Sequence, residues 1–432
     1  MTDNNSGGTG NAEGTHQRKQ FFDILEKEVD LEEELSEVPK KRFVIPIIKK
    51  NLGIDRTEKI PNEIDERSLK KIYKALDEMI GGYVAELIND ILRRPLLLNE
   101  LRDIKDIQSL DALESKKYLK PLLDFQDSYL STDEWKESKA LLEAADDLLD
   151  NISGVIKTRY LGMLENSWGL YYWKSGEYDL AEKKFKNSLG LAKKVNDKDM
   201  VAKAYHGLGV LYGDAKEDKM EAVKQNEKCI KTLKRLEQTN SNLRREASVL
   251  NNIGVAYHKM AEDSKLKDED EKVKEYFKRA AENYKEAIDL AVKLNYTHMV
   301  GWVSFNLGEI YAYLGEFDKA NSCSQDSREI YQKELDNERG LSGVEMLDAV
   351  IALQKGDYDS ALDYINKSLD LRKKLKEPRR TADALVCRGD INLEMDDIAG
   401  AKEDYQESLE IYESMGSSDG VERVKKKISN IG

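Results

Sequence analysis

Small and bulky apolar residues recur at fixed offsets through most of the chain, and this recurrence predicts its architecture. In the stretch 164–191, Gly169 and Tyr172 are followed by Gly176, Ala181 and Phe185. Two antiparallel helices joined by a tight turn explain these offsets, because a small residue on each helix lets the two backbones approach closely. A glycine at the turn adopts the left-handed conformation at the least cost. The pattern predicts a helical hairpin that crosses at Gly169 and Ala181 and turns at Gly176.

The same offsets return along the rest of the chain. The small residues expected at the later crossings are Gly209 with Ala222, Gly254 with Ala280, Gly308 with Ala320, Ala349 with Ala361, and Gly389 with Ala401. From Ala320 to Ala361 is 41 residues, and from Ala361 to Ala401 is 40. The segment 115–150 shows a degenerate form of the pattern and is interpreted as a seventh unit or as a cap on the first repeat.

This pattern resembles the tetratricopeptide repeat, a helix-turn-helix unit with a usual period of about 34 residues. The longer period is similar to the repeats of kinesin light chains, of LGN-type adaptors and of bacterial peptide-pheromone receptors. The resemblance implies an all-α fold, a right-handed α-solenoid of six to seven repeats. We expect the solenoid to span residues 111–416, followed by a capping helix over 417–432.

The region before the solenoid is different. Residues 1–15 are polar and rich in glycine, which predicts a disordered tail, and 16–110 are expected to form a helical N-terminal region. Within it the apolar run 43–48 is interpreted as an extended arm, since Pro46 argues against a central strand. Apolar residues at three- and four-residue steps then predict one long amphipathic helix over 69–92, with a kink or close crossing at Gly81 and Gly82. Its apolar stripe must pack within the chain, the interpretation we favour, or against a second copy.

Charge and chemistry narrow the functional classes. The chain has 83 acidic and 69 basic residues, a net charge of −14, which argues against a protein devoted to nucleic acid. Segment 40–74 has a local basic excess, and pairing with the acidic residues before it is favoured over an anionic partner. No catalytic, metal-binding or cofactor motif is recognisable, so we expect neither an enzyme nor a cofactor. Three isolated cysteines and the absence of a signal or membrane span favour a cytoplasmic protein.

The third repeat carries an insertion. Gly254 and Ala280 lie 26 residues apart, against 12 for Gly169 and Ala181. The added residues are mostly charged, from Lys265 to Lys272. Longer helices joined by a charged, solvated turn are expected, with a second contact surface as the alternative.

The resemblance also implies where a ligand binds. In this family the first helix of each repeat faces the groove with positions two, five, six, nine, twelve and thirteen, counting the crossing glycine as the eighth. The residues that we carry over to this face are Lys203, His206, Asn251, Asn252, His258, Trp302, Phe305, Asn306, Glu309 and Tyr313. Asn252 and Asn306 hold the position that bonds a peptide backbone in the long-repeat relatives, although asparagines there can instead bond only the neighbouring helices.

We therefore expect a non-enzymatic adaptor or scaffold that binds a protein or peptide partner in the groove. One alternative is a regulator that responds to a signal peptide, with the N-terminal helices as effector. A second alternative is a structural assembly protein that forms a homodimer through the 69–92 helix.

Overall fold

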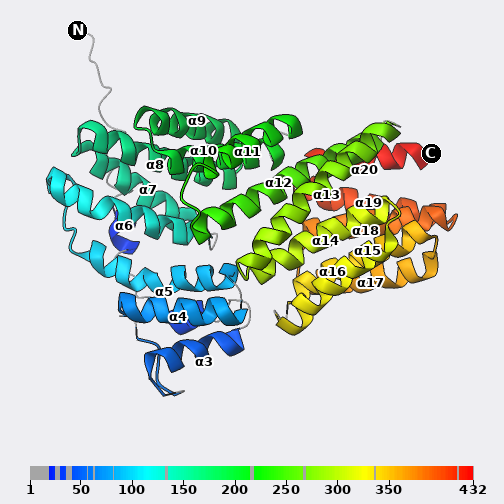
Figure 1. Cartoon of the computed structure of the whole chain (residues 1–432), viewed down its shortest axis with the longest axis horizontal. Coiled ribbons are helices and arrows are strands. Elements are labelled where there is room, and N and C mark those ends of the chain that lie inside the picture. Colours follow the sequence, from blue (N-terminus) through cyan, green and yellow to red (C-terminus); the bar gives the residue numbers. More distant parts are fainter. Residues whose placement is uncertain are drawn as a thin grey trace, which may run out of the picture. The chain divides into compact units, whose positions relative to one another are not determined.

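The computed structural model describes residues 19–24, 30–35, 41–55, 57–61, 64–80, 82–131, 135–214, 218–265, 269–334, 337–415 and 418–431. Over these ranges the chain forms helices joined by turns, and no strand occurs among them (Figure 1). Successive helices pack as antiparallel pairs, so the expected all-α solenoid is confirmed. The predicted tail, 1–15, lies outside the described residues.

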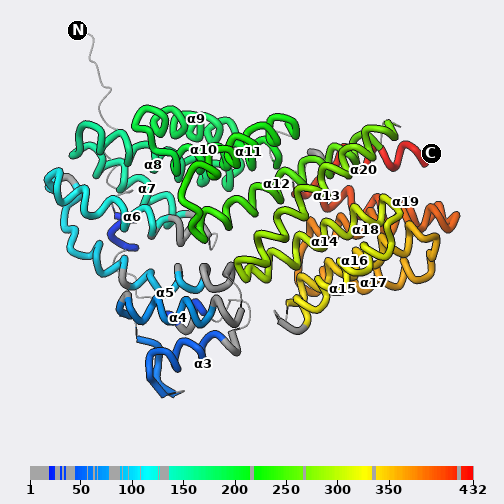
Figure 2. The backbone as a smooth tube through the Cα atoms, in the orientation of Figure 1, coloured from blue at the N-terminus to red at the C-terminus, as the bar shows by residue number. Residues whose placement is uncertain are grey.

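The chain divides into two compact units, one ending at Ala256 and one beginning at Tyr257. The first unit contains α2 (Leu31–Glu34), α3 (Lys41–Leu52), α4 (Glu66–Ile80), α5 (Gly82–Arg102), the short 3-10 helix η1 (Ile107–Ser109), α6 (Ala112–Ser131), α7 (Trp135–Asp150), α8 (Gly154–Lys174), α9 (Tyr178–Lys194), α10 (Lys198–Asp214) and α11 (Lys219–Leu233). Helix α12 (Asn240–Lys265) runs through the division. Figure 2 traces this path along the backbone.

The second unit begins with the long helix that follows α12, continues through three helical hairpins and ends in a single helix. Its elements are α13 (Asp270–Lys293), α14 (Thr297–Tyr313), α15 (Phe317–Glu329) with the π-helical turn η2 (Ile330–Glu334), α16 (Glu338–Lys355), α17 (Tyr358–Lys374), α18 (Pro378–Glu394), α19 (Ile398–Ser414) and α20 (Ser418–Ile431). The insertion appears as added helix length, because α12 has 26 residues and α13 has 24, whereas α14 has 17.

The helix crossings lie where the sequence predicts them. Ala181, Ala320 and Ala401 are all fully buried. A Cβ added to Gly169 would stand 2.6 Å from the ring of Phe185, so this crossing accepts only glycine without movement of the ring. The predicted left-handed turn is present at Gly176, with φ of +82°.

A buried serine on the second helix ties it to the first helix in four repeats. The hydroxyl of each donates to a backbone carbonyl, with oxygen–oxygen distances of 2.7–3.0 Å, in the pairs Ser188 to Gly162, Ser327 to Gly301, Ser368 to Ser342 and Ser408 to Ala382. In the second repeat a cysteine takes this place, with Cys229 Sγ 3.2 Å from the carbonyl oxygen of Ala202. The bond recurs because each serine stands seven residues after the crossing alanine.

The N-terminal region is helical but differs from the prediction in two places. Residues 43–48 belong to α3, so the extended arm is wrong. Val44, Ile47 and Ile48 share one side of this helix and are buried, while Pro46 stands on the exposed side. The helical spacing of the apolar residues therefore decides the conformation, although the proline removes one helical hydrogen bond.

The expected single helix over 69–92 is instead the pair α4 and α5, and α5 continues through Pro95 to Arg102. The break falls beside the predicted kink, since α5 begins at Gly82. The described residues of the stripe are buried in the core of the first unit: Leu69, Ile72, Leu76, Ile88, Ile91 and Leu92. The stripe therefore packs within the chain, the interpretation favoured from the sequence.

Two further features bear on the sequence predictions. Lys59 of the basic segment pairs with Asp30, with the Lys59 nitrogen 3.2 Å from the Asp30 oxygen. None of the helices in the described ranges combines the length and the apolarity that crossing a membrane requires.

Candidate binding face on the first helices

The residues predicted to face the groove stand on α10, α12 and α14, the first helices of the second, third and fourth repeats. They fall into two groups, one in each unit. The first group is Lys203, His206, Asn251 and Asn252, and the second is His258, Trp302, Phe305, Asn306, Glu309 and Tyr313.

In the first unit the structure brings His206 and Asn252 together across neighbouring first helices. The side-chain nitrogen of Asn252 lies 3.3 Å from Nε2 of His206. Burial, and then the positive charge of Arg245, lower the pKa of His206 to about 4. The ring is therefore neutral at pH 7 and accepts this hydrogen bond, because an amide nitrogen only donates.

Lys203 is exposed beside this pair. Its Nζ lies 3.4 Å from Asp199, whose carboxylate is also 2.7 Å from Nη1 of Arg245. Burial raises the pKa of Asp199, but the hydrogen bond from Arg245 and the charge of Lys203 outweigh it and leave that pKa below its ordinary value. Asn251 is half-buried on the same helix as Asn252.

In the second unit, Tyr313 and His258 belong to an aromatic layer. The ring of Tyr313 stacks on Phe277 with 5.3 Å between centroids and 5° between planes. His258 meets both rings edge-on, at 5.8 Å from Phe277 and 6.5 Å from Tyr313. Burial raises the pKa of Tyr313 well above its ordinary value, and burial also raises the pKa of Glu309, which the charge of His258 partly offsets. Tyr313 is nevertheless half-buried, so this end of α14 is not closed off from solvent.

The opposite end of α14 is open. Trp302 has 42% of its surface exposed although it is a large aromatic residue. The guanidinium carbon of Arg380 stands 5.6 Å from the centre of its ring, a cation–π contact that orients the indole. Phe305 and Asn306 are half-buried one turn further along the helix.

Helix α16 packs beside this face. A Cβ added to Gly343 would stand 3.9 Å from the ring of Phe305, an ordinary van der Waals contact. Trp302 and Tyr313 are eleven residues apart on one helix, about 16 Å along its axis. Trp302 is therefore the exposed residue among those predicted on α14, whereas Phe305, Asn306, Glu309 and Tyr313 are half-buried. Arg380 was missed because it precedes the counted positions of its repeat.

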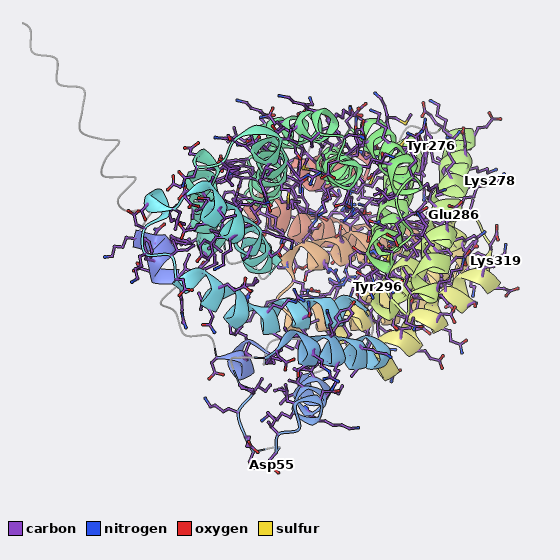
Figure 3. All side chains as sticks on the ribbon, turned by 60° about the vertical axis from the view of Figure 1, so that its left-hand side comes forward. Asp55, Tyr276, Lys278, Glu286, Tyr296 and Lys319 are labelled. Atoms are coloured by element: carbon purple, nitrogen blue, oxygen red, sulfur yellow. The ribbon has the colours of Figure 1, made fainter. Side chains whose placement is uncertain are left out.

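A cleft lies in the second unit between α13 and the end of α14. Its volume is about 740 Å³, and its lining includes Phe277, Tyr311, Tyr313 and Leu314 with charged residues of α13. Figure 3 shows Tyr276, Lys278 and Glu286 following one another along α13, with Lys319 on α15 below them. The charges that line the cleft are three lysines, Lys274, Lys278 and Lys285, and three acids, Asp270, Glu282 and Glu316, so they select neither sign of ligand.

Two cysteines of the described chain, Cys229 and Cys323, have thiols that burial makes poorly reactive. Burial raises the pKa of the Cys229 thiol to about 12 and that of Cys323 to about 11, so both stay protonated at pH 7. Over the ranges that the structure describes, no group of three histidine, cysteine, aspartate or glutamate side chains is placed to hold a metal ion.

Comparison with known proteins agrees with this architecture. Residues 349–414 match the model of the tetratricopeptide repeat family. Among solved structures, the apo form of RapI is 13% identical and has a TM-score of 0.56, over 69% of this chain and 99% of that one. Aspartyl phosphate phosphatase F from Bacillus subtilis is 14% identical with a TM-score of 0.53, over 95% and 96%. At these identities the likeness shows the fold alone. No curated protein matches the sequence.

Proposed function

We propose that this tetratricopeptide-repeat protein is a non-enzymatic adaptor or scaffold, which binds a protein or peptide partner on the inward face of its first helices. The anchor of that face is the open end of α14, with Trp302 as its centre. Phe305 and Asn306 supply an apolar contact and an amide beside it. In the first unit, Asn252 on α12 and Lys203 on α10 form a separate candidate contact.

The exposure of Trp302 is the observation that carries this proposal. Aromatic side chains bury about 150–250 Å² each when covered, and two-fifths of the indole is open to solvent. Covering about 100 Å² of apolar surface stabilises a complex by about 2–3 kcal/mol. The cation–π contact with Arg380 holds the ring in place before binding, which lowers the entropy that a partner must overcome.

The amides set the kind of partner. Asparagine offers a donor and an acceptor together, which matches the N–H and C=O of an extended peptide. One hydrogen bond contributes about 0.5–1.5 kcal/mol. The indole therefore supplies the larger share of the affinity, and the amides fix the position of the peptide along the face. An unstructured segment of a partner protein fits this division of roles.

Affinity capture on the immobilised full-length chain tests the proposal. A partner retained by the wild type should be reduced at least ten-fold with Trp302→Ala. Tyr178→Ala is the matched control, because Tyr178 is an aromatic residue of the second helix α9 with 41% exposure. Partners retained equally by both variants, at equal helicity, would place the binding surface elsewhere.

One observation favours a regulatory role for the N-terminal helices as a second candidate. Arg244 at the start of α12 donates from Nη1 to the hydroxyl of Tyr73 on α4, at 2.6 Å and 171 residues away in sequence. Helix α12 also carries Asn252, so within the first unit the same helix contacts α4 and holds a candidate binding residue. If partner binding is transmitted along it, amide exchange in α4 should change on addition of a captured partner, and Tyr73→Phe should weaken that change. An α4 whose exchange is unaffected by the partner would exclude the effector role.

A further inference from the structure

The last repeat contains two matching sites for a cationic side chain. Each pairs a carboxylate of α18 with a tyrosine of α19. Tyr412 donates its hydroxyl hydrogen to Asp383, and Tyr405 donates to Asp390 in the same way. Tyr412 is 2% exposed and Tyr405 is 0% exposed, so the packing of both rings in the core of the repeat fixes the position of their hydroxyls.

Both sites are filled by the chain's own C-terminal helix. Nη2 of Arg423 lies 2.7 Å from Asp383 and 2.7 Å from the hydroxyl oxygen of Tyr412. Nζ of Lys427 lies 2.7 and 2.9 Å from the two oxygens of Asp390. Each cation also stands over the tyrosine of its site, at 5.7 Å for Arg423 and 5.8 Å for Lys427. Carboxylate, hydroxyl and aromatic face together recognise a cation.

The two carboxylates occupy groove positions. Counting Gly389 as the eighth residue of its repeat, Asp383 is the second and Asp390 the ninth, both among the inward-facing positions. Arg423 and Lys427 are four residues apart and therefore lie on one side of α20, one helical turn from each other. Helix α20 thus binds, through Arg423 and Lys427, the residues of the last repeat that position counting predicts to face the groove.

Helix α20 packs on the last repeat through Val424, with Val421, Ile428 and Ile431 partly buried beside it, and its ion pairs lie at the edge of this contact. The side chains in its ion pairs are 26–36% exposed, so water competes for them. Val424 is buried, but Glu422, Lys425 and Lys426 on the outer side are exposed. A short helix with one covered side opens at lower free energy than the helices packed on both sides.

We propose that the face formed by α18 and α19 is a docking surface for a basic helical segment of a partner protein, with arginine and lysine one turn apart, and that α20 holds this place in the free chain. The inference rests on the proposed function, because it assigns a partner class to the groove side of the last repeat. Asp383 and Asp390 bind the two cations, while Tyr405 and Tyr412 orient the carboxylates. The partner displaces α20 by supplying the same contacts.

The test uses a fluorescent peptide with the sequence of residues 418–431, titrated into the full-length chain by anisotropy. Wild type should bind it weakly, because the tethered α20 competes at an effective concentration of about 1 mM. The variant Arg423→Gln with Lys427→Gln should bind it at least ten-fold tighter. Adding Asp383→Asn and Asp390→Asn to that variant should abolish the gain. A control peptide with Arg423→Glu and Lys427→Glu should not bind.

Three results would overturn the proposal: equal affinity of wild type and the glutamine variant, no effect of the asparagine changes, or no binding by a folded glutamine variant. Concentration-dependent dimers of that variant that need Asp383 would also overturn it, because the occupant would be a second copy. If the variant does not fold, hydrogen exchange of the wild type decides instead. Amides of α20 should exchange at least ten-fold faster than those of α18, and equal rates would exclude displacement.

This assay does not involve Asn252, Asn306 or Trp302. A peptide that fails here while captured partners still depend on Trp302 would reject the basic-helix inference and keep the proposed function. The opposite result would reject the role of the α14 face and keep the cation sites.

Discussion

The recurrent serine bond gives a prediction that can be worked through in detail. Ser408→Ala removes a fully buried hydroxyl that donates to the carbonyl of Ala382 at 2.9 Å. That carbonyl lies inside α18 and still accepts its helical N–H bond, so the change leaves no buried acceptor unpaired. The expected loss is the net value of one hydrogen bond, about 0.5–1.5 kcal/mol in the free energy of unfolding. Ser188→Ala and Ser368→Ala should cost the same.

Urea unfolding followed by circular dichroism measures this loss. The control is Ser414→Ala, since Ser414 is exposed and bonds within its own helix; it should change stability by less than about 0.5 kcal/mol. The second repeat offers the reverse change. Cys229→Ser replaces a weak sulfur donor with a hydroxyl at the equivalent place and should be neutral or stabilising. Losses for the buried serines no larger than for Ser414 would refute the view that this bond holds each hairpin together.

Three further predictions concern the turn, the groove and a crossing. Gly176→Ala should destabilise the protein by about 1–2 kcal/mol because the φ of Gly176 is +82°. Gly190→Ala should stabilise it by about 0.5–1 kcal/mol, because Gly190 lies in a helix with open space around it. If the turn is correct, the two variants shift the thermal unfolding midpoint in opposite directions. His206 has a folded pKa of about 4, below its unfolded value, so the stability it contributes is full above pH 6.5 and is lost as pH falls toward 4. His206→Gln should therefore lose less stability between pH 7 and pH 5 than wild type in urea titrations, and an equal loss would contradict the burial of this ring. Ala320→Leu adds three carbons at a fully buried crossing and should cost about 1–3 kcal/mol, and an unchanged midpoint of thermal unfolding would mean that the crossing lies elsewhere.

The repeats were predictable because their packing requires residues of particular sizes at particular positions. Gly169 and Ala181 mark a crossing that only small residues allow, and Gly176 marks a turn that needs a positive φ. Each signal recurs at a fixed offset, so several weak signals reinforce one another. The N-terminal region offers no recurrence, and there Pro46 and Pro95 were given more weight than the apolar spacing around them. Helices α3 and α5 both contain a proline, whereas the sequence analysis took each proline as evidence that regular structure is interrupted there.

The candidate site was predictable only in part. Position counting predicted which residues of α14 face inward, but it could not predict how exposed each one is, because that depends on side chains of other helices. Phe277 stacks on Tyr313, and Arg380 orients Trp302 without covering it. The cation sites of the last repeat were missed for a similar reason: Asp383 and Asp390 look like solvated carboxylates until α20 is seen to cross them. Their inward positions were the signal that could have found them.

Photo-crosslinking tests the central claim most directly. A photoreactive phenylalanine analogue placed at position 302 of the full-length chain should crosslink to the captured partner, since that position lies at the open end of α14. The same analogue at position 178, equally exposed on a second helix, should not. Crosslinks at 302 and none at 178 are the result that the account predicts. Crosslinks at 178 and none at 302 would show that the partner binds the second helices, and would contradict a binding face on the first.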